Sequence, residues 1–397
     1  MRVIYISALS SVGMIDMIKS CINRDPGYAV QKFNRLIVRG LLSTNSDVDV
    51  MSAPPIDRRS EKKLFINKRE IEDGILYKYI PFINLKGFKQ LSIFLYSFFS
   101  VLKYGILKKK YSVVCDALAI SSSMGAVMAS KIIGMKCVGI MTDMPGLMVN
   151  QVGRQQSPVK RLMHATIAQI NKMVLSGFSH YVFLTEPMNY VVNRHNRPYI
   201  IMEGLCDPKM GDMERVPKFK VRTIMYAGGL HEKYGLKKLT EAFMSLPDAN
   251  IRLLVYGAGP YADELKRMSE LDSRIDFRGL ASNNDVIAAE MQSTLLVNPR
   301  PTTEEFTKYS FPSKNIEYMA SGTPLLTTKL PGIPAEYSDY VFFIEDESVE
   351  GYAKALNRVL SKGDTYLADF GDKAKQWVLK HKNYKYQASR IISLLEV

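Results

Sequence analysis

A lysine, a glutamate and the predicted start of a helix lie together in one short stretch of this chain. Residues 311–324 read Phe-Pro-Ser-Lys-Asn-Ile-Glu-Tyr-Met-Ala-Ser-Gly-Thr-Pro. Pro312 suits the first turn of a helix, and Ser313 is a capping type of residue. The free N–H groups of such a helix start, together with Lys314, suit a diphosphate, and Glu317 can accept hydrogen bonds from the hydroxyls of a ribose. A nucleotide diphosphate-sugar needs this combination, although an ordinary loop and surface helix account for the stretch alone equally well.

The elements around this stretch alternate between short apolar strands and helices. The strands expected in the first half are 3–6, 48–51, 113–115, 136–141, 182–184 and 199–201. After a linker over 204–220 the alternation restarts, with strands at 223–226, 251–256, 275–277 and 295–297. Such alternation predicts parallel sheets covered by helices on both faces. The expected fold class is therefore α/β, with two Rossmann-like doubly wound domains that face each other across a cleft.

The length of the chain agrees with two domains. With 397 residues it exceeds one typical domain, and we expect an N-terminal domain over 1–205 and a C-terminal domain over 206–375. Four widely spaced cysteines without a Cys-x-x-Cys pair fit a reducing compartment. The first residues predict a β-strand rather than a secretory signal.

The positive charge is concentrated in the first half of the sequence. Residues 1–208 contain 27 Lys and Arg against 14 Asp and Glu, whereas residues 209–397 contain 26 against 25. This asymmetry favours an anionic partner for the first half, either a nucleic acid or a membrane surface. A solvated basic surface without a partner is the alternative.

The segment between Tyr79 and Tyr111 favours the membrane. Residues 91–107 are mostly apolar and aromatic, and Lys108–Lys110 follow them directly. The stretch is too short and too polar for a span, but it suits an amphipathic helix at a bilayer interface. A buried helix of the α/β domain is the alternative. Because no nucleic-acid-binding motif is present, we expect no nucleic acid as partner. The basic and apolar segment instead leads us to expect a cytoplasmic protein that is held peripherally at the inner face of the cytoplasmic membrane.

Two glycine-containing loops follow strands of the second half. Gly228 and Gly229 come directly after strand 223–226, where glycines let a backbone approach a ligand closely. Residues 257–262 read Gly-Ala-Gly-Pro-Tyr-Ala and, with Asp276, satisfy the spacing of a dinucleotide fingerprint. An NAD-dependent oxidoreductase built on Gly257 is therefore an alternative function, although this loop follows the second strand of its domain rather than the first.

A third loop carries the second cation that a diphosphate requires. Arg300 follows strand 295–297, and its planar guanidinium suits phosphate oxygens. Pairing of Arg300 with Glu304 or Glu305 is the alternative.

In their order along the chain, these motifs resemble the C-terminal domain of family 4 glycosyltransferases, which are retaining enzymes with the GT-B fold. The resemblance covers residues 222–345 and is carried by 226–230 (Tyr-Ala-Gly-Gly-Leu), 255–260 (Val-Tyr-Gly-Ala-Gly-Pro), 276–280 (Asp-Phe-Arg-Gly-Leu) and 311–326. The last segment, 376–397, resembles the family's terminal helix that crosses back to the first domain.

The resemblance implies roles for individual residues. Glu317 matches the second glutamate of the family's Glu-x7-Glu motif and is implied to bind the ribose, whereas Tyr309 occupies the position of the first glutamate. The family's cations after the first strand of this domain fall on Gly229 and Tyr234, with Lys233 adjacent. Phosphate binding is therefore expected from Lys233 together with Arg300 and Lys314.

The implied reaction is transfer of a hexosyl or N-acetylhexosaminyl group from a nucleotide diphosphate-sugar, with retention. The sequence Phe-Pro-Ser-Lys is typical of enzymes of bacterial surface polysaccharide assembly, so the acceptor is expected to be a glycan linked to a polyprenyl diphosphate. Lys314, Arg300 and the amides after Phe311 would stabilise the leaving diphosphate. Asp143 would orient the acceptor hydroxyl, unless it serves only the turn before Pro145.

Several expectations complete this interpretation. Gly13 would let the first loop approach the donor, with a plain turn as the alternative. The histidines show no ligand spacing, so neither a metal nor a cofactor is expected. The remaining alternatives are a sugar-nucleotide epimerase of the same architecture and an inactive scaffold that binds a nucleotide-sugar.

Overall fold

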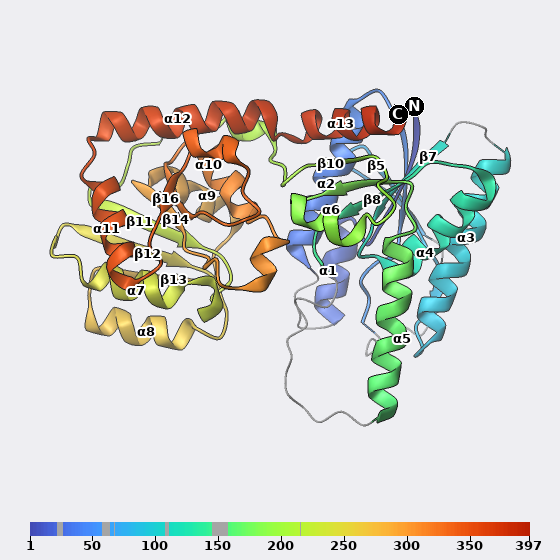
Figure 1. The fold of residues 1–397 in the computed structure, drawn as a ribbon, viewed down its shortest axis with the longest axis horizontal. Helices are drawn as coiled ribbons and strands as arrows, with labels where there is room; N and C mark the ends of the chain where they lie inside the picture. The colour runs from blue at the N-terminus through green and yellow to red at the C-terminus, as the bar shows by residue number, and fades with distance from the viewer. Residues whose placement is uncertain (22–26, 58–63, 67, 108–110, 145–157, 215) are drawn as a thin grey trace. The chain divides into compact units, whose positions relative to one another are not determined.

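The chain forms two compact units. The computed structural model describes residues 1–21, 27–57, 64–66, 68–107, 111–144, 158–214 and 216–397. The first unit consists of Met1–Met202 together with Tyr384–Val397, and the second of Glu203–Asn383 (Figure 1). The predicted α/β class, with a largely parallel sheet in each unit, is confirmed. None of the described helices is both long and apolar enough to cross a membrane.

The first unit is built on one large twisted sheet. Its strands follow the order β10-β9-β8-β7-β1-β2-β5-β4, and all neighbours are parallel except β4 and β5. The central strands β1 and β7 are almost wholly buried, as expected for a parallel sheet covered on both faces. The strands are β1 (Arg2–Ser7), β2 (Asp47–Ser52), β4 (Arg69–Glu72), β5 (Ile75–Tyr79), β7 (Tyr111–Asp116), β8 (Cys137–Met141), β9 (His180–Phe183) and β10 (Tyr199–Ile201), with a small antiparallel pair of β3 (Leu64–Phe65) and β6 (Phe82–Ile83).

Helices connect these strands. They are α1 (Val12–Cys21), α2 (Tyr28–Ser43), α3 (Phe88–Leu107), α4 (Ile120–Ile133), α5 (Pro158–Leu175), α6 (Glu186–Val192) and the C-terminal α13 (Tyr384–Glu396). α3 packs along α4, and α5 extends away from the sheet beside them (Figure 1). α13 packs on α2 at Gly40, where an added Cβ would lie 2.4 Å from the Tyr384 carbonyl oxygen.

The antiparallel hairpin β4–β5 is an element that the sequence analysis did not predict. Asp73 and Gly74 form its turn with φ angles of 50° and 76°. Positive φ at both central residues is the requirement of the tight hairpin turn that an Asp-Gly pair favours. The Asp73-Gly74 pair was therefore a usable signal in the sequence.

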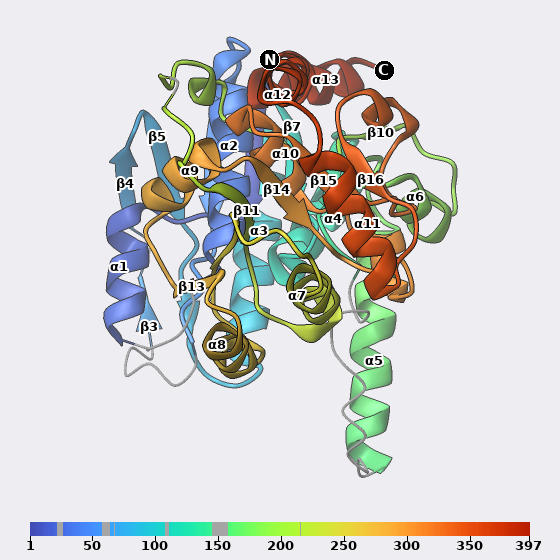
Figure 2. The same cartoon turned by 90° about the vertical axis from the view of Figure 1, so that its left-hand side faces the viewer.

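The second unit has helices on both faces of a parallel sheet. Its strand order is β13-β12-β11-β14-β15-β16. In Figure 2, α7, α8 and α12 are seen end-on, with α7 and α8 on one side of the strands and α12 on the other. The strands are β11 (Arg222–Ala227), β12 (Ile251–Tyr256), β13 (Ile275–Gly279), β14 (Leu295–Asn298), β15 (Leu325–Thr328) and β16 (Phe342–Ile344).

The core of this unit lies between the sheet and the layer of α7 and α11. Leu236, Phe243 and Val359 are fully buried there. The helices are α7 (Leu236–Met244), α8 (Ala262–Leu271), α9 (Asn283–Gln292), α10 (Ser313–Ser321), α11 (Val349–Leu360) and α12 (Asp364–His381). The segment 376–397, expected as one helix, consists of the end of α12 and the whole of α13, separated at Lys382 and Asn383.

Candidate functional site

The start of α10 is uncapped by side chains. Pro312 occupies the N-cap position and Ser313 is the first helical residue, so Ser313 does not act as the predicted cap. The N–H group of Asn315 donates to the carbonyl of Pro312 at 2.8 Å. The chain therefore enters α10 through a tight turn, and the helix start depends on contacts made further along.

Two sets of buried hydrogen bonds fix α10 against the carboxyl ends of the strands. The Tyr318 hydroxyl donates to the Ala227 carbonyl at 3.0 Å and accepts from the Ala227 N–H at 2.8 Å, which ties α10 to the end of β11. Asn298, the last residue of β14, donates from Nδ2 to Oδ1 of Asn315 at 2.6 Å. Burial raises the pKa of Tyr318 well above its usual value, so this hydroxyl stays neutral and can both donate and accept.

Lys314 lies between two carboxylates. Its Nζ is 3.6 Å from Oε1 of Glu290 and 3.4 Å from Oε1 of Glu317. The side chain of Glu290, from α9, is 0% exposed, and Lys314 is its cationic neighbour. The sequence analysis missed Glu290, because no local signal connects the end of α9 to the start of α10. The structure thus joins the two predicted residues Lys314 and Glu317 in one cluster with a third.

A second group of cations shares two aromatic rings. The Arg300 guanidinium carbon lies 5.1 Å from the Tyr234 ring centroid and 5.5 Å from that of Phe306. The Lys233 ammonium lies 5.7 Å and 5.6 Å from the same two centroids. Arg300 also donates from Nη1 to the Ser310 hydroxyl at 3.3 Å. Cation–π contacts thus hold two like charges beside the same rings, at the loops that follow β11 and β14.

The glycine loops after β11 and β12 pack directly against each other. Gly257 has φ 140°, and a Cβ there would stand 1.9 Å from the Gly228 carbonyl oxygen. At Gly259 a Cβ would stand 2.3 Å from the Leu230 carbonyl oxygen. The loops are joined by hydrogen bonds from Leu230 N–H to the Ala258 carbonyl and from Tyr261 N–H to the Leu230 carbonyl. Packing of this chain's own backbone therefore accounts for both glycines of the dinucleotide-like motif.

Asp276, the acidic residue of that motif, also contacts neighbouring side chains. The Asp276 carboxylate accepts two hydrogen bonds from Arg278, at 2.6 and 2.8 Å, and lies 3.8 Å from Arg252. This arrangement gives Asp276 a structural role on β13.

The other predicted donor residues surround the start of α10. Phe311 is buried, with its ring centroid 5.3 Å from that of Tyr337. Tyr309 is half-buried and ends the short 3-10 turn Glu305–Lys308. Gly229 is held by its carbonyl, which accepts from the Tyr226 hydroxyl at 2.9 Å.

Two predicted residues belong to the first unit. Asp143 follows β8, is half-buried, and accepts from the Met144 N–H at 2.7 Å, which is the local turn contact considered from the sequence. Gly13 is the second residue of α1, and among the described residues outside its own helix turn no atom lies within 4 Å of the place where its Cβ would stand. Lys108–Lys110 and Pro145 lie outside the described residues.

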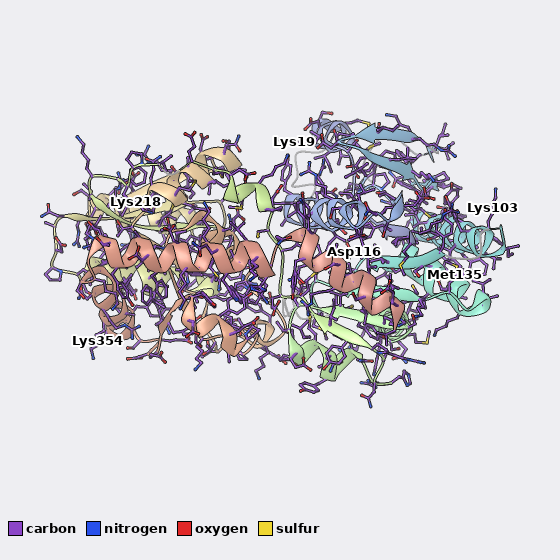
Figure 3. The ribbon with its side chains drawn as sticks, turned by 90° about the horizontal axis from the view of Figure 1, so that it is seen from above. Lys19, Lys103, Asp116, Met135, Lys218 and Lys354 are labelled. Carbon is purple, nitrogen blue, oxygen red and sulfur yellow. The ribbon has the colours of Figure 1, made fainter. Side chains whose placement is uncertain are left out.

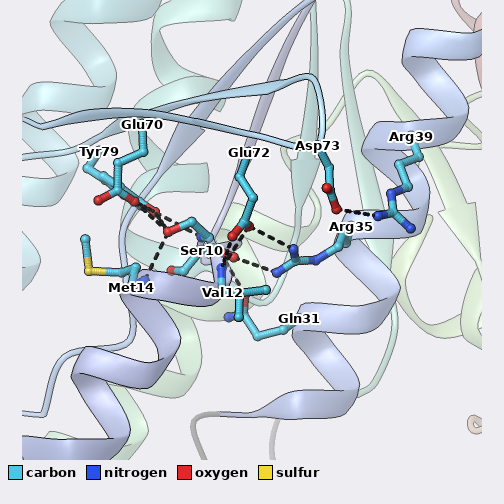
Figure 4. Close-up of polar contacts among 11 residues, drawn as sticks. Ser10, Val12, Met14, Gln31, Arg35, Arg39, Glu70, Glu72, Asp73 and Tyr79 are labelled. Atoms are coloured by element: carbon cyan, nitrogen blue, oxygen red, sulfur yellow. Dashed lines mark hydrogen bonds and ion pairs between the residues drawn. The ribbon is translucent and has the colours of Figure 1, made fainter. Parts of the chain in front are cut away.

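Carboxylates of the unpredicted hairpin hold the loop between β1 and α1 (Figure 4). Glu72 accepts from the Val12 N–H at 2.8 Å and from Arg35 Nη1 at 3.1 Å. Glu70 accepts from the Ser11 hydroxyl at 2.5 Å and from the Tyr79 hydroxyl at 3.0 Å. Although partial burial opposes it, hydrogen bonds from Lys68, Ser11 and Tyr79 keep the pKa of Glu70 below its usual value. The loop before α1, which leads to Gly13, is thereby fixed in place.

A buried aspartate lies at the end of β7, near the centre of the first unit in Figure 3. Asp116 accepts from Asn34 Nδ2 at 3.2 Å and from the Leu118 N–H at 3.0 Å. Burial raises the pKa of Asp116 above its usual value. Among the described residues, no group of three His, Cys, Asp or Glu side chains is placed to hold a metal ion.

Part of the second unit matches a known protein family, and the whole chain is similar to solved structures. Residues 221–362, which run from β11 to α11, match the family Glycosyl transferases group 1. No curated protein sequence matches the chain. A sucrose-phosphate synthase from Thermosynechococcus elongatus has a similar structure, with a TM-score of 0.64 and 14% identity over 100% of this chain and 98% of that one.

Two further solved structures are similar over their whole length. One is the lipopolysaccharide outer core galactosyltransferase WaaB, with a TM-score of 0.62 and 13% identity over 100% of this chain and 99% of that one. The other is Anabaena HepE in complex with UDP, with a TM-score of 0.62 and 13% identity over 99% of this chain and 100% of that one. These likenesses confirm the GT-B fold, and the group 1 domain in the second unit supports glycosyl transfer as the activity.

Proposed function

We propose that the second unit binds a nucleotide diphosphate-sugar and that the protein transfers its sugar to a glycan acceptor with retention. The observation that carries this proposal is the pair of cations, Arg300 and Lys233, held over the same two rings at the strand ends. Two like charges placed together are stabilised by an anion between or beside them. A diphosphate has the charge and size for that role.

The remaining contacts of the donor follow from the geometry around α10. Glu317 is the carboxylate for the ribose hydroxyls, one helical turn from the uncapped start of α10. In this structure the Lys314 ammonium is paired with the carboxylates of Glu290 and Glu317. We propose that a donor phosphate replaces part of these carboxylate contacts of Lys314, while Glu290 keeps the ammonium oriented.

In the reaction, the bond between the anomeric carbon and the phosphate oxygen breaks, and negative charge develops on the departing nucleoside diphosphate. Arg300, Lys233 and the amides at the start of α10 would stabilise that charge. The acceptor hydroxyl, which Asp143 would orient, forms the new bond to the anomeric carbon, and its proton passes to the departing phosphate oxygen. Neither a resident metal nor a cofactor has a role in this scheme.

The finer assignment is a hexosyl or N-acetylhexosaminyl transfer to a glycan linked to a polyprenyl diphosphate, in bacterial polysaccharide assembly. Its support is the Phe-Pro-Ser-Lys sequence at 311–314 and the fold shared with a lipopolysaccharide galactosyltransferase and with HepE, which was solved with UDP. Packing of Gly257 and Gly259 against the neighbouring backbone removes the main support for an NAD-dependent oxidoreductase.

A thermal-shift panel tests the proposal. UDP-, GDP-, ADP- and dTDP-sugars are compared with NAD and NADP, because a bound ligand raises the melting temperature by mass action. Stabilisation by the sugars of one nucleotide, lost in Arg300→Ala, is the expected result. Stabilisation by NAD alone would overturn the proposal. Turnover of the stabilising donor then separates an enzyme from an inactive scaffold in which Tyr309 replaces the first motif glutamate.

A further inference from the structure

The outward face of α3 carries a continuous row of large apolar side chains. Phe88, Leu91, Leu95, Phe99 and Ile106 are all exposed and recur every three to seven residues along the helix. Phe99 is 60% and Ile106 66% exposed. A helix on the surface of a soluble domain ordinarily places polar residues on this face. We name these five side chains the α3 stripe.

The inward face of α3 explains why the bulky residues point outward. Ser97 is fully buried and donates to the Ser122 carbonyl of α4 at 2.9 Å. A Cβ on Gly125 of α4 would stand 2.5 Å from the Phe94 carbonyl oxygen. The backbones of α3 and α4 therefore approach too closely for large side chains between them. Ser97 and Gly125 fill this contact, Ile93 and Val101 of α3 are buried as well, and the five exposed side chains lie on the opposite side.

α4 extends the apolar surface at the end of α3. Gly105 of α3 lies against Ile133 and Met135, which brings the C-terminal ends of the two helices together. Ile132, at that end of α4, is 66% exposed. Ile132 is thus a further exposed apolar side chain, at the end of α4 that lies beside the C-terminal end of α3.

The charged residues of α3, α4 and α5 all have one sign. The sequences of α3, α4 and α5 contain no Asp or Glu in 20, 14 and 18 residues, although acidic residues make up 39 of the 397 in the chain. The same three helices contain six cationic residues, namely Lys89, Lys103, Lys131, Lys160, Arg161 and Lys172. Lys103 is exposed on α3 and projects at the outer edge of the first unit (Figure 3).

We infer that the α3 stripe and Ile132 dock on an anionic lipid bilayer, with α3 lying along the surface. An apolar row flanked by cations and free of carboxylates is complementary to acyl chains beneath anionic headgroups. A second copy of this chain is disfavoured as the occupant, because it would place two surfaces of the same positive sign in contact. The inner side of α3 stays packed on α4, so only the stripe enters the interface.

Sedimentation of the full chain with vesicles tests this inference. Vesicles of phosphatidylcholine with phosphatidylglycerol are compared with vesicles of phosphatidylcholine alone, and we expect binding only to the former. The double variant Leu95→Glu/Phe99→Glu should bind at least about tenfold more weakly, because two exposed apolar anchors are lost. The matched control is Leu271→Glu/Leu280→Glu, which adds the same charges at exposed leucines of the second unit and should sediment nearly as wild type.

Three further results decide the interpretation. Lys103→Gln/Lys131→Gln should weaken binding to the anionic vesicles without loss of melting temperature. Unchanged sedimentation of the stripe variant, or equal loss in the matched control, would overturn the inference. The wild type could instead fail to sediment with vesicles and be a dimer, while the stripe variant is a monomer. In that case the surface is a protein interface. Thermal shifts induced by the donor report on the second unit. A negative vesicle experiment therefore leaves the proposed function to be tested separately.

Discussion

Lys314 is the side chain whose surroundings differ most from what its position in the sequence suggested. It was expected to be a cation directed at phosphate, and the structure pairs it with the fully buried carboxylate of Glu290 and with Glu317. The lysine therefore contributes to stability as well as to the proposed donor site. The two contributions can be separated by mutation.

We predict that Lys314→Ala lowers the free energy of unfolding by about 1–3 kcal/mol, because it removes a cation from beside the buried Glu290 carboxylate, at a site where Lys314 itself is partly exposed. In Lys314→Ala/Glu290→Gln most of this loss should be recovered, since the buried charge is gone. Urea unfolding of the wild type, both single variants and the double variant measures the coupling. Strictly additive effects would show that Glu290 and Lys314 do not stabilise each other.

Arg300 differs from Lys314 because its neighbours are rings and a hydroxyl. We predict that Arg300→Lys weakens binding of a nucleoside diphosphate by about tenfold, because lysine keeps the charge but loses the planar stacking and the paired N–H groups. Affinity for the corresponding nucleoside should stay nearly constant. Calorimetric titration with both ligands measures this, and Lys308→Ala on the exposed side of the same loop is the control. Equal loss for nucleoside and nucleoside diphosphate would remove Arg300 from the phosphate site.

At the scale of elements, two glycines that the sequence analysis both considered for a ligand site have different structural roles. Gly257 adopts a positive φ against the Gly228 carbonyl, whereas Gly13 lies in the first turn of α1 beside open space. One position therefore fixes two loops to each other, and the other leaves room for a ligand or solvent.

We predict opposite effects of the same substitution at these positions. Gly257→Ala should destabilise the second unit by about 1–3 kcal/mol, because the added Cβ meets backbone and the φ is strained. Gly13→Ala should be neutral or stabilising by up to about 1 kcal/mol, because alanine favours the helix. Thermal melts of both variants measure these effects. A decrease in transfer rate with a stable Gly13→Ala would support the predicted approach of this loop to the donor, whereas unchanged kinetics would favour a plain turn.

At the scale of the whole molecule, burial in the first unit, with two nearby cations, changes the pKa of a histidine. His180 begins β9 and is almost covered. Burial, followed by the charges of Lys136 and Arg197, lowers its pKa below the usual value. The unfolded chain therefore binds this proton more readily than the folded one, and the stabilisation is present above the ordinary histidine pKa and is lost as the pH falls through the lower, folded value.

We expect the free energy of unfolding of the first unit to decrease as the pH falls below about 6.5, the ordinary histidine value. His180→Gln should reduce this slope, because glutamine takes up no proton in that range. Urea unfolding at several pH values between neutral and mildly acidic conditions measures the difference. His231→Gln, in the second unit, is the control, and an identical pH slope in wild type and His180→Gln would contradict the prediction.

Much of the fold was determined by the sequence alone. The strands that alternate with helices, from β1 to β14 apart from β3 to β6, were predicted close to their observed positions, because this alternation leaves a local signal. The candidate residues Arg300 and Glu317 were also recognisable in the sequence, since Arg300 follows a strand and Glu317 lies near a helix start. The hairpin β4–β5 was missed although its Asp73-Gly74 turn was visible.

Only the tertiary structure decided which of these residues meet. Strand β14 lies beside β11 through a crossover, which brings the loop of Lys233 to the loop of Arg300, and the packing of α9 beside α10 brings Glu290 to Lys314. The face of α3 that points outward was likewise undetermined, because the helix is apolar on several sides and its contacts with α4, at Ser97 and opposite Gly125, select the buried one. Local patterns specify elements, whereas contacts between distant side chains depend on sheet order and on how closely two backbones can approach.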